Sequence, residues 1–300
     1  MNVHITGAGG FVGQNLVPYL NDQALPTYIV SRQQLCSMDV ELFENSAIVH
    51  LAGKAHDLKN VSQPEEYYQV NFELTKKLYD AFLKSEAKKF IFISTVKAVA
   101  DHLDEPLTED HMPDPQTHYG KSKLMAEEYI RSQALPEGKS YYILRPCMIH
   151  GPGNKGNLNL LYQFVQKGIP YPLAGFKNKR SFLSVENLCF IIKELIERED
   201  IPSGVYNVAD DEALSTNQLV LLLSEALNKS PRLLHVPARL ISFAARVGDF
   251  LKLPLNTERL EKLTGNFVVS NQKIKKALKK ELPLSAKDGI LKTARAFKNI

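Results

Sequence analysis

The sequence predicts an α/β fold: a doubly wound parallel sheet, followed by a smaller and mostly helical C-terminal part. Two observations carry this prediction. From residue 3 to about residue 145, strand-like apolar runs alternate with helical patterns, as expected of βαβ units. Apolar runs such as Phe90-Ile91-Phe92-Ile93 lack polar alternation, which is typical of parallel strands that are covered on both faces.

The individual elements follow from hydrophobic periodicity and from turn and cap signals. In the first half we expect helices and strands in alternation: strands at 3–6, 28–30, 47–51, 90–94 and 141–145, and helices at 11–20, 65–84 and 119–133. Proline is favoured at a helix start, and Pro64 precedes the long helix. After Pro146 a loop-forming run is followed by a helix at 158–167, a strand at 181–185, a helix at 186–198 and a strand at 204–208. Cys147 and His150 flank the fifth strand, where we expect core packing for both.

Length and composition indicate a soluble enzyme of ordinary globular character. The 300 residues are 44% hydrophobic and 23% charged, with a net charge of +4, which indicates neither a nucleic-acid partner nor a disordered chain. The three cysteines form no C-x-x-C pair, so we expect a reducing, cytoplasmic compartment and no metal site. No apolar run reaches transmembrane length and the chain starts directly on a strand, so we expect no membrane partner and no cleaved signal.

The chain opens with a glycine-rich turn between a strand and a helix. Glycines stand at 7, 10 and 13 in the run Thr6-Gly7-Ala8-Gly9-Gly10-Phe11-Val12-Gly13. Glycine permits a tight turn and lets backbone N–H groups approach a pyrophosphate, while the helix N-terminus offers the positive end of its dipole. Because the turn follows the first strand of a βαβ pattern, we predict a dinucleotide site that includes Gly7, Gly10, Phe11, Val12 and Gly13.

A second motif carries the chemistry. Tyr119 and Lys123 are four residues apart in a helical pattern and therefore share one helix face. A nearby ammonium favours tyrosinate, so we expect Lys123 to lower the pKa of Tyr119 toward the working pH. Such a phenol can protonate a carbonyl oxygen while hydride arrives at carbon, or do the reverse. Of the twelve tyrosines, only Tyr119 has lysine four residues later, so we predict that both residues are catalytic.

These motifs together resemble the extended short-chain dehydrogenase/reductase family, the NAD-dependent epimerase/dehydratase family, whose members act mostly on nucleotide sugars. The spacing T-G-x-x-G-x-x-G is the variant found there, with Val12 where the common dinucleotide motif has its third glycine. The resemblance runs from residue 3 to about residue 295. It implies a Rossmann-type dinucleotide domain at 1–152, to which 181–208 partly returns, and a substrate-binding lobe built from 153–180 and 209–300.

The resemblance also implies roles for residues that the spacing alone does not assign. Thr95 matches the catalytic serine/threonine that binds the substrate oxygen, with Ser94 as the neighbouring alternative. Further cofactor contacts, besides Tyr119 and Lys123, are implied for Asp39, Leu51, Ala52, Gly53, Asn71 and Pro146. Asn157 and Arg180 match positions near the nucleotide-sugar diphosphate, for which a guanidinium is well suited.

The end of the second strand determines the expected cofactor. An acidic residue there would accept the ribose 2′-hydroxyl of NAD, but this chain has Ser31 and Arg32. Arginine matches a 2′-phosphate and serine adds a hydrogen bond. We therefore favour NADP(H). The alternative is that Arg32 stacks on adenine, which would also suit NAD(H).

The residues after Thr95 narrow the reaction. Nucleotide-sugar dehydratases of the family place an aspartate–glutamate pair there, whereas this chain has Val96 and Lys97. We therefore expect hydride transfer at C4 of a UDP- or dTDP-linked 4-keto-6-deoxyhexose, a 4-ketoreductase of bacterial surface polysaccharide synthesis. A nucleotide-sugar 4-epimerase with bound NAD is the alternative. A non-catalytic, cofactor-sensing protein is a second alternative, although such relatives usually lose the tyrosine or lysine.

The resemblance finally implies a homodimer. Family members commonly pair the two helices expected at 65–84 and 119–133 into a four-helix bundle. Apolar positions of the first helix could form the seam, although some must cover the sheet instead: Tyr68, Phe72, Leu78 and Phe82.

Overall fold

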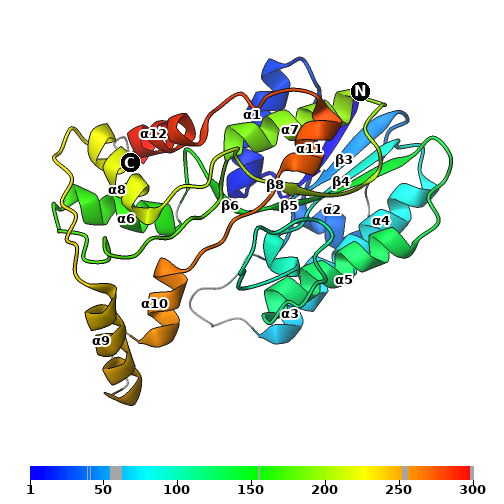
Figure 1. Cartoon of the computed structure of the whole chain (residues 1–300). Helices are drawn as coiled ribbons and strands as arrows, with labels where there is room; N and C mark the ends of the chain where they lie inside the picture. The colour runs from blue at the N-terminus through cyan, green and yellow to red at the C-terminus, as the bar shows by residue number, and fades with distance from the viewer. Residues whose placement is uncertain (39, 41, 55–62, 155, 252–255, 298–300) are drawn as a thin grey trace.

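The central element is a six-stranded, all-parallel sheet with the strand order β2-β1-β3-β4-β5-β8 (Figure 1). The computed structural model describes residues 1–38, 40, 42–54, 63–154, 156–251 and 256–297. The doubly wound α/β prediction is confirmed. The strands are β1 Asn2–Thr6, β2 Thr27–Val30, β3 Ser46–His50, β4 Lys89–Ile93, β5 Ser140–Pro146 and β8 Gly204–Val208.

Helices cover both faces of this sheet, which explains why its strands lack polar alternation. On one face, Ile5, Val49 and Ile91 join a core with α1 (Phe11–Asp22) and α7 (Val185–Glu197). On the other face, the alternate strand residues pack against α4 (Leu74–Lys84) and α5 (His118–Ser132), as the members of that core show: Ile48, Phe90, Phe92, Leu78, Phe82 and Ile130.

Two local features differ from the sequence expectation. The helix expected at 65–84 is α3 (Pro64–Tyr68) and α4 joined by a π-helical segment, Gln69–Glu73. A short helix that we did not predict, α2 (Arg32–Ser37), follows β2. Ser31 begins α2 with a reciprocal capping box, because its hydroxyl accepts from the Gln34 N–H and the Gln34 amide accepts from the Ser31 N–H. The S-x-x-Q spacing is the signal that would have indicated this helix.

The C-terminal part has its own hydrophobic core. Two short strands, β6 (Met148–His150) and β7 (Phe182–Ser184), form a separate parallel pair, so the strand expected at 181–185 does not join the main sheet. Buried residues such as Leu158, Leu223 and Ile290 unite the remaining helices into one cluster. These helices are α6 Asn157–Gln166, α8 Thr216–Ala226, α9 Ala238–Leu251, α10 Thr257–Thr264 and α12 Ala286–Phe297. The short helix α11, Gln272–Leu278, instead packs through Ile274 and Leu278 into the core that α1 and α7 share with the main sheet.

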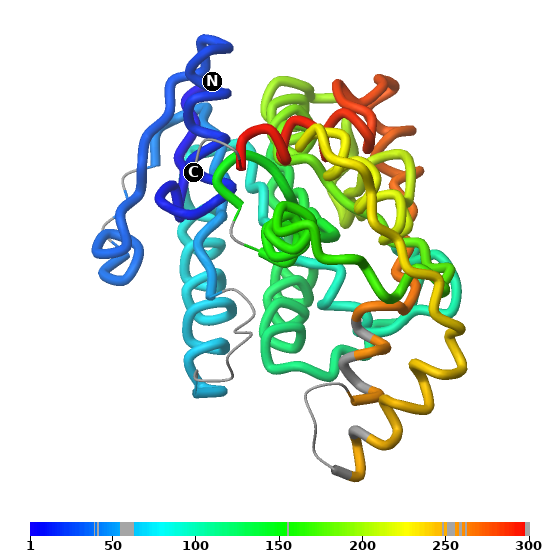
Figure 2. The backbone as a smooth tube through the Cα atoms, turned by 90° about the vertical axis from the view of Figure 1, so that its left-hand side faces the viewer, coloured from blue at the N-terminus to red at the C-terminus, as the bar shows by residue number. Residues whose placement is uncertain are grey.

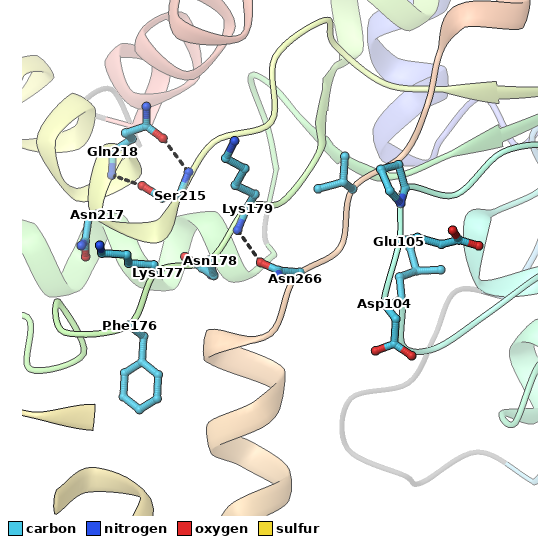
Figure 3. A pocket seen from close by; sticks show the side chains of 13 residues that line it. Asp104, Glu105, Phe176, Lys177, Asn178, Lys179, Ser215, Asn217, Gln218 and Asn266 are labelled. Carbon is cyan, nitrogen blue, oxygen red and sulfur yellow. Dashed lines mark hydrogen bonds between the residues drawn. The ribbon is translucent and has the colours of Figure 1, made fainter. Parts of the chain in front are cut away.

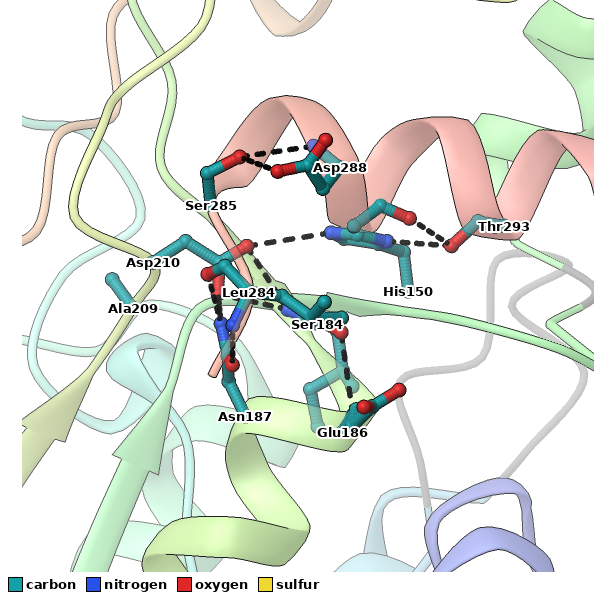
Figure 4. Close-up of polar contacts among 12 residues, drawn as sticks. His150, Ser184, Glu186, Asn187, Ala209, Asp210, Leu284, Ser285, Asp288 and Thr293 are labelled. Carbon is teal, nitrogen blue, oxygen red and sulfur yellow. Dashed lines mark hydrogen bonds and ion pairs between the residues drawn. The ribbon is translucent and has the colours of Figure 1, made fainter. Parts of the chain in front are cut away.

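A buried polar network fastens α12 to the strands before it (Figure 4). The Nε2 atom of His150 lies 3.6 Å from the Asp210 carboxylate, and its Nδ1 lies 2.8 Å from the Thr293 hydroxyl. Asp210 also accepts hydrogen bonds from the Ser184 N–H at 3.1 Å and from the Asn187 amide at 2.7 Å. Both His150 and Cys147 are buried, as we expected.

The helices α9 and α10 project from the rest of the molecule in both views (Figures 1 and 2). Among the described residues, no helix has the length and apolar content that crossing a bilayer requires.

Candidate functional site

The glycine turn after β1 is folded as the motif predicts. Gly7 has a φ of +71°, a conformation that favours glycine, and a Cβ there would lie 2.6 Å from the Ala52 nitrogen. A Cβ at Gly13 would lie 2.5 Å from the Ala8 backbone. The glycines at 7 and 13 therefore let β1, the loop after β3 and α1 approach one another more closely than other residues would allow.

The first turn of α1 is available to an anion. Gly10 begins the helix without a side-chain cap, and no acidic residue stands in the first turn. Phe11 and Val12 follow at the positions whose N–H groups have no partner within a helix. The close-packed glycine turn and this uncapped helix start fit the pyrophosphate of a dinucleotide.

The loop after β3 is held against β1 by a chain of buried hydrogen bonds. Thr6 lies between two groups, because its hydroxyl is 2.7 Å from His50 Nδ1 and accepts from the Ala52 N–H at 3.1 Å. The Leu51 N–H donates to the Thr6 carbonyl at 3.3 Å. On its other side, His50 Nε2 lies 2.9 Å from the Thr75 hydroxyl. Burial, and then the nearby Lys123, lower the pKa of His50 to about 3, so this histidine is neutral.

Asn71 connects this loop to the helix that carries the Tyr-x-x-x-Lys motif. Its side chain accepts from the Lys54 N–H at 2.7 Å and donates to the Lys54 carbonyl at 3.1 Å and to the Ser122 hydroxyl at 3.0 Å. A Cβ at Gly53 would lie 3.0 Å from the Asn71 side chain and 3.3 Å from Lys123 Nζ. Asn71 lies in the π-helical segment, a distortion that is frequent at functional sites.

The three residues predicted to be catalytic come together at the carboxyl end of β4. The Thr95 hydroxyl is hydrogen-bonded to the Tyr119 phenol. Lys123, one helical turn further along α5, is 5% exposed and donates to the Ile93 carbonyl at 2.8 Å. Gly120 lets α5 lie close to the loop after β4, because a Cβ at this position would collide with the Lys97 carbonyl.

The electrostatics of this group differ from the sequence expectation. We expected Lys123 to lower the pKa of Tyr119, but desolvation raises that pKa, and the hydrogen bond from Thr95 opposes the rise. Burial also lowers the pKa of Lys123 to about 8, against the attraction of Glu127. Burial therefore shifts both groups toward their neutral forms, but with a pKa of about 8 Lys123 is still mainly an ammonium at pH 7.

A buried ion pair that sequence reasoning missed lies behind this group. Arg145, at the end of β5, donates from Nε to both Glu127 oxygens at 3.1 and 3.0 Å, and from Nη2 at 2.5 Å. The Ser94 hydroxyl donates to the same carboxylate. Ser94 is thus engaged by Glu127 and Thr95 by Tyr119. The position of Glu127, four residues after Lys123 on the same helix face, was the available signal.

The remaining cofactor candidates that the structure describes lie at the ends of two strands, β2 and β5. Ser31 caps α2, and Arg32 is exposed at the first position of that helix. Pro146 is the buried last residue of β5, opposite Val208 of β8. Asp39 lies outside the described residues.

The two residues predicted to contact the substrate, Asn157 and Arg180, have different surroundings. Asn157 is exposed at the start of α6, and the preceding loop is held by buried Asn154, which donates to the Ile149 carbonyl at 2.7 Å. Arg180 is half-buried, which lowers the pKa of its guanidinium. Its backbone exchanges two 2.9 Å hydrogen bonds with Leu214.

A cavity of about 590 Å³ lies between the loop at 103–106 and the C-terminal part (Figure 3). Lys177, Asn178 and Lys179 line one side, and Asp104 and Glu105 line the other. Sequence reasoning did not predict this cavity, because its walls come from four separate segments.

One contact joins the segment after Thr95 to a segment that lines the cavity. The ammonium of Lys97, two residues after Thr95, lies 4.7 Å from the centre of the Phe267 ring. The neighbours of Phe267 in sequence, Asn266 and Val268, line the cavity. The described residues contain no cluster of three or more metal-ligating side chains.

Comparison with known proteins places this geometry in a family. The chain is 31% identical to UDP-glucose 4-epimerase of Vibrio cholerae, over 99% of this chain and 95% of that protein. It is also 31% identical to N-acetyl-α-D-glucosaminyl-diphospho-ditrans,octacis-undecaprenol 4-epimerase of Escherichia coli O157:H7, over 92% and 85% of the two chains. RMD from Pseudomonas aeruginosa, solved with NADPH, superposes with a TM-score of 0.73 at 20% identity, over 99% and 98%. Residues 3–209 match the model of the NAD dependent epimerase/dehydratase family, and the chain belongs to that family.

Proposed function

We propose that this enzyme transfers hydride at C4 of a hexose carried on a diphosphate, with Tyr119 as the acid/base. The observation that carries the proposal is the juxtaposition of Thr95, Tyr119 and Lys123 beside the glycine turn of α1. The proposed site spans the dinucleotide domain at 1–152 and the lobe formed by 153–180 and 209–300, with 181–208 partly returning to the former.

Different residues of the chain bind the cofactor and carry out the proton transfer. A nicotinamide dinucleotide, when bound, supplies the hydride acceptor and donor. The N-terminus of α1 holds its pyrophosphate, and the loop at 51–53 and Asn71 shape its remaining site. The Tyr119 phenol oxygen exchanges a proton with the C4 oxygen, while Thr95 orients that oxygen through a hydrogen bond. The Lys123 ammonium stabilises the phenolate, which opposes the desolvation of Tyr119.

The cavity beside this group suits the diphosphate and what it carries. Lys177 and Lys179 supply positive charge, and the amide of Asn178 holds the wall in place through hydrogen bonds to Thr216. Phosphate oxygens are favoured partners of such cations. Asn157 and Arg180 remain proposed contacts to the same diphosphate.

Two outcomes of the C4 chemistry are supported by different observations. The two relatives at 31% identity are both named 4-epimerases, which favours epimerisation with retained NAD(H). Arg32 at the end of β2, and a structural neighbour that binds NADPH, favour a 4-ketoreductase with NADP(H). Epimerisation is the first candidate, because the epimerase relatives are the more similar in sequence. For either reaction, we propose that the enzyme acts in the cytoplasm, in bacterial surface polysaccharide synthesis.

Two other functions, dehydration and non-catalytic cofactor sensing, have less support. Dehydration needs carboxylates after Thr95, whereas Val96 is buried and Lys97 forms a 3.2 Å ion pair with Asp101. A cofactor-sensing role without catalysis has no support from the site, because tyrosine and lysine both remain.

Bound-nucleotide analysis and substrate assays together test the proposal. Mass spectrometry of the purified protein identifies the retained dinucleotide. UDP-linked and dTDP-linked hexoses are then followed by NMR for inversion at C4, and 4-keto sugars with NADPH for reduction. Comparing turnover of the same hexosamine attached to UDP and to a polyprenyl diphosphate shows which kind of carrier the enzyme accepts. Turnover of none of these substrates, by protein that binds a dinucleotide, would contradict the proposal.

We also propose a homodimer through α3, α4 and α5. Of the four apolar residues considered for the seam, Leu78 and Phe82 are buried in the core against the sheet. Tyr68 and Phe72 are half-buried and remain available for contact with a second copy. Light scattering at micromolar concentration tests the proposal, and the mass of a monomer would contradict it.

A further inference from the structure

One face of α9 is apolar and exposed. Leu240, Phe243, Val247 and Phe250 are 61%, 67%, 38% and 87% exposed, and we call these four residues the α9 stripe. Exposed apolar residues are ordinary when they are scattered singly. Four of them on one 14-residue helix are not scattered, so the arrangement needs an explanation.

The spacing shows that the stripe is one continuous surface. Positions i, i+3, i+7 and i+10 of an α-helix fall within an arc of about 80°. A different face of α9 attaches it to the protein, because Ile241 and Ala245 are buried with Leu260 of α10 in the core of the C-terminal part. The stripe is therefore surplus to the packing of the helix.

The charges beside the stripe are positive. Arg239 and Arg246 are exposed, and helical geometry places both along the same edge of the stripe, next to Phe250. The acidic residue of the helix, Asp249, lies away from the stripe and accepts hydrogen bonds from the Thr257 N–H, at 3.0 Å, and hydroxyl. Arg246 thus lies beside the stripe, whereas Asp249 lies farther around α9.

We propose that the α9 stripe docks on the surface of an anionic phospholipid membrane. An interfacial helix lies in the membrane plane with aromatic and aliphatic residues among the acyl chains and with basic residues at the headgroups. Phe243 and Phe250 supply the former, and Arg239 and Arg246 the latter. The stripe lies on α9, which projects from the rest of the molecule (Figures 1 and 2).

A second copy of this chain is a less suitable partner. Antiparallel pairing of two α9 helices through the stripe would place four arginines along one narrow seam. The Asp249 carboxylate of each copy would not offset these charges, because it accepts hydrogen bonds from Thr257 at the start of α10. Like charges in such proximity oppose association. An anionic surface instead attracts both arginines at once.

The inference reverses one expectation from the sequence. The absence of a long apolar run indicated no membrane partner, but that criterion detects only segments that span a bilayer. Docking through α9 is independent of which sugar the cavity takes.

Vesicle flotation of the full-length protein tests the inference. The probes are vesicles of phosphatidylcholine containing phosphatidylglycerol, and vesicles of phosphatidylcholine alone. We expect the protein to float with the anionic vesicles, and the partition coefficient to fall about tenfold or more in Phe243→Ser/Phe250→Ser. The control variant Met112→Ser/Leu160→Ser removes two residues of similar exposure, 90% and 61%, that lie outside α9. It should float like the wild type.

A second variant tests the charges. Arg239→Gln/Arg246→Gln should weaken binding to the anionic vesicles by about fivefold per arginine, with little change for the neutral vesicles. Equal thermal midpoints show that each variant is folded. Three results would overturn the inference: no flotation of the wild type, undiminished flotation of the phenylalanine variant, or equal loss in the control. A concentration-dependent dimer that the phenylalanine variant abolishes, without flotation, would assign the stripe to a second copy instead.

Discussion

Arg145 and Glu127 form a buried, bidentate ion pair directly behind the candidate catalytic group. Both side chains are at most 2% exposed, and the Glu127 carboxylate also accepts from Ser94. The pair connects the carboxyl ends of β4 and β5 to α5, the helix that carries Tyr119 and Lys123. It therefore sets where these strand ends lie relative to the acid/base.

Breaking this pair on one side should be far more harmful than replacing it. Glu127→Gln leaves the Arg145 charge buried without its counterion, which typically costs about 3–5 kcal/mol of the free energy of unfolding. Replacing both residues with apolar ones, as in Glu127→Leu/Arg145→Met, should recover most of that loss. Urea unfolding of the single and double variants measures both effects. A loss below about 1 kcal/mol in Glu127→Gln would show that the pair is not structurally important.

Tyr119→Phe should retain the fold and lose turnover. The substitution removes the hydroxyl that exchanges the proton and leaves the ring in place, and general acid catalysis contributes about 10²–10⁴-fold to a rate. Tyr68→Phe is a matched control, since the Tyr68 hydroxyl is 3.0 Å from His118 Nδ1, outside the proposed proton path. Steady-state turnover of both variants decides the assignment. Near-normal turnover in Tyr119→Phe would refute the role of this tyrosine.

Arg32→Ala should weaken NADPH selectively. Charge-assisted hydrogen bonds contribute roughly 1.5–3 kcal/mol, so loss of the proposed contact with the 2′-phosphate should weaken NADPH about tenfold to a hundredfold. NADH binding should change little. Gln33→Ala, on the adjacent exposed residue, is the control, and titration of both cofactors is the measurement. Equal losses for the two cofactors would mean that Arg32 stacks on adenine.

Acid should destabilise the protein through His50. Burial lowers the pKa of this histidine to about 3, so the unfolded chain, with a pKa near 6.5, binds the proton more readily. Stability is then complete above about pH 6.5 and decreases as the pH falls toward 3. As the pH falls from 7 to 5, protonation of His50 in the unfolded chain should lower the free energy of unfolding by about 2 kcal/mol.

The slope of stability with pH is the measurement that isolates this histidine. His50→Gln should flatten the loss in urea unfolding, whereas His102→Gln, at a histidine that is 67% exposed, should not. An unchanged slope in His50→Gln would contradict the assignment.

The sequence alone determined the elements whose signals are local. The turn at Gly7–Gly13 was predictable because glycine spacing acts through the backbone of a few consecutive residues. Tyr119 and Lys123 were predictable as neighbours because helical periodicity fixes residues four apart on one face. The parallel sheet was predictable because burial on both faces leaves continuous apolar runs.

Only the tertiary structure decided what depends on contacts between distant segments. It paired Glu127 with Arg145, and it divided the adjacent hydroxyls so that Ser94 contacts Glu127 and Thr95 contacts Tyr119. It also raised the pKa of Tyr119 through desolvation, where the sequence predicted a lowered pKa. Residue spacing carries no information about which distant groups exclude water from a site, and that exclusion sets the strength of every charge within it.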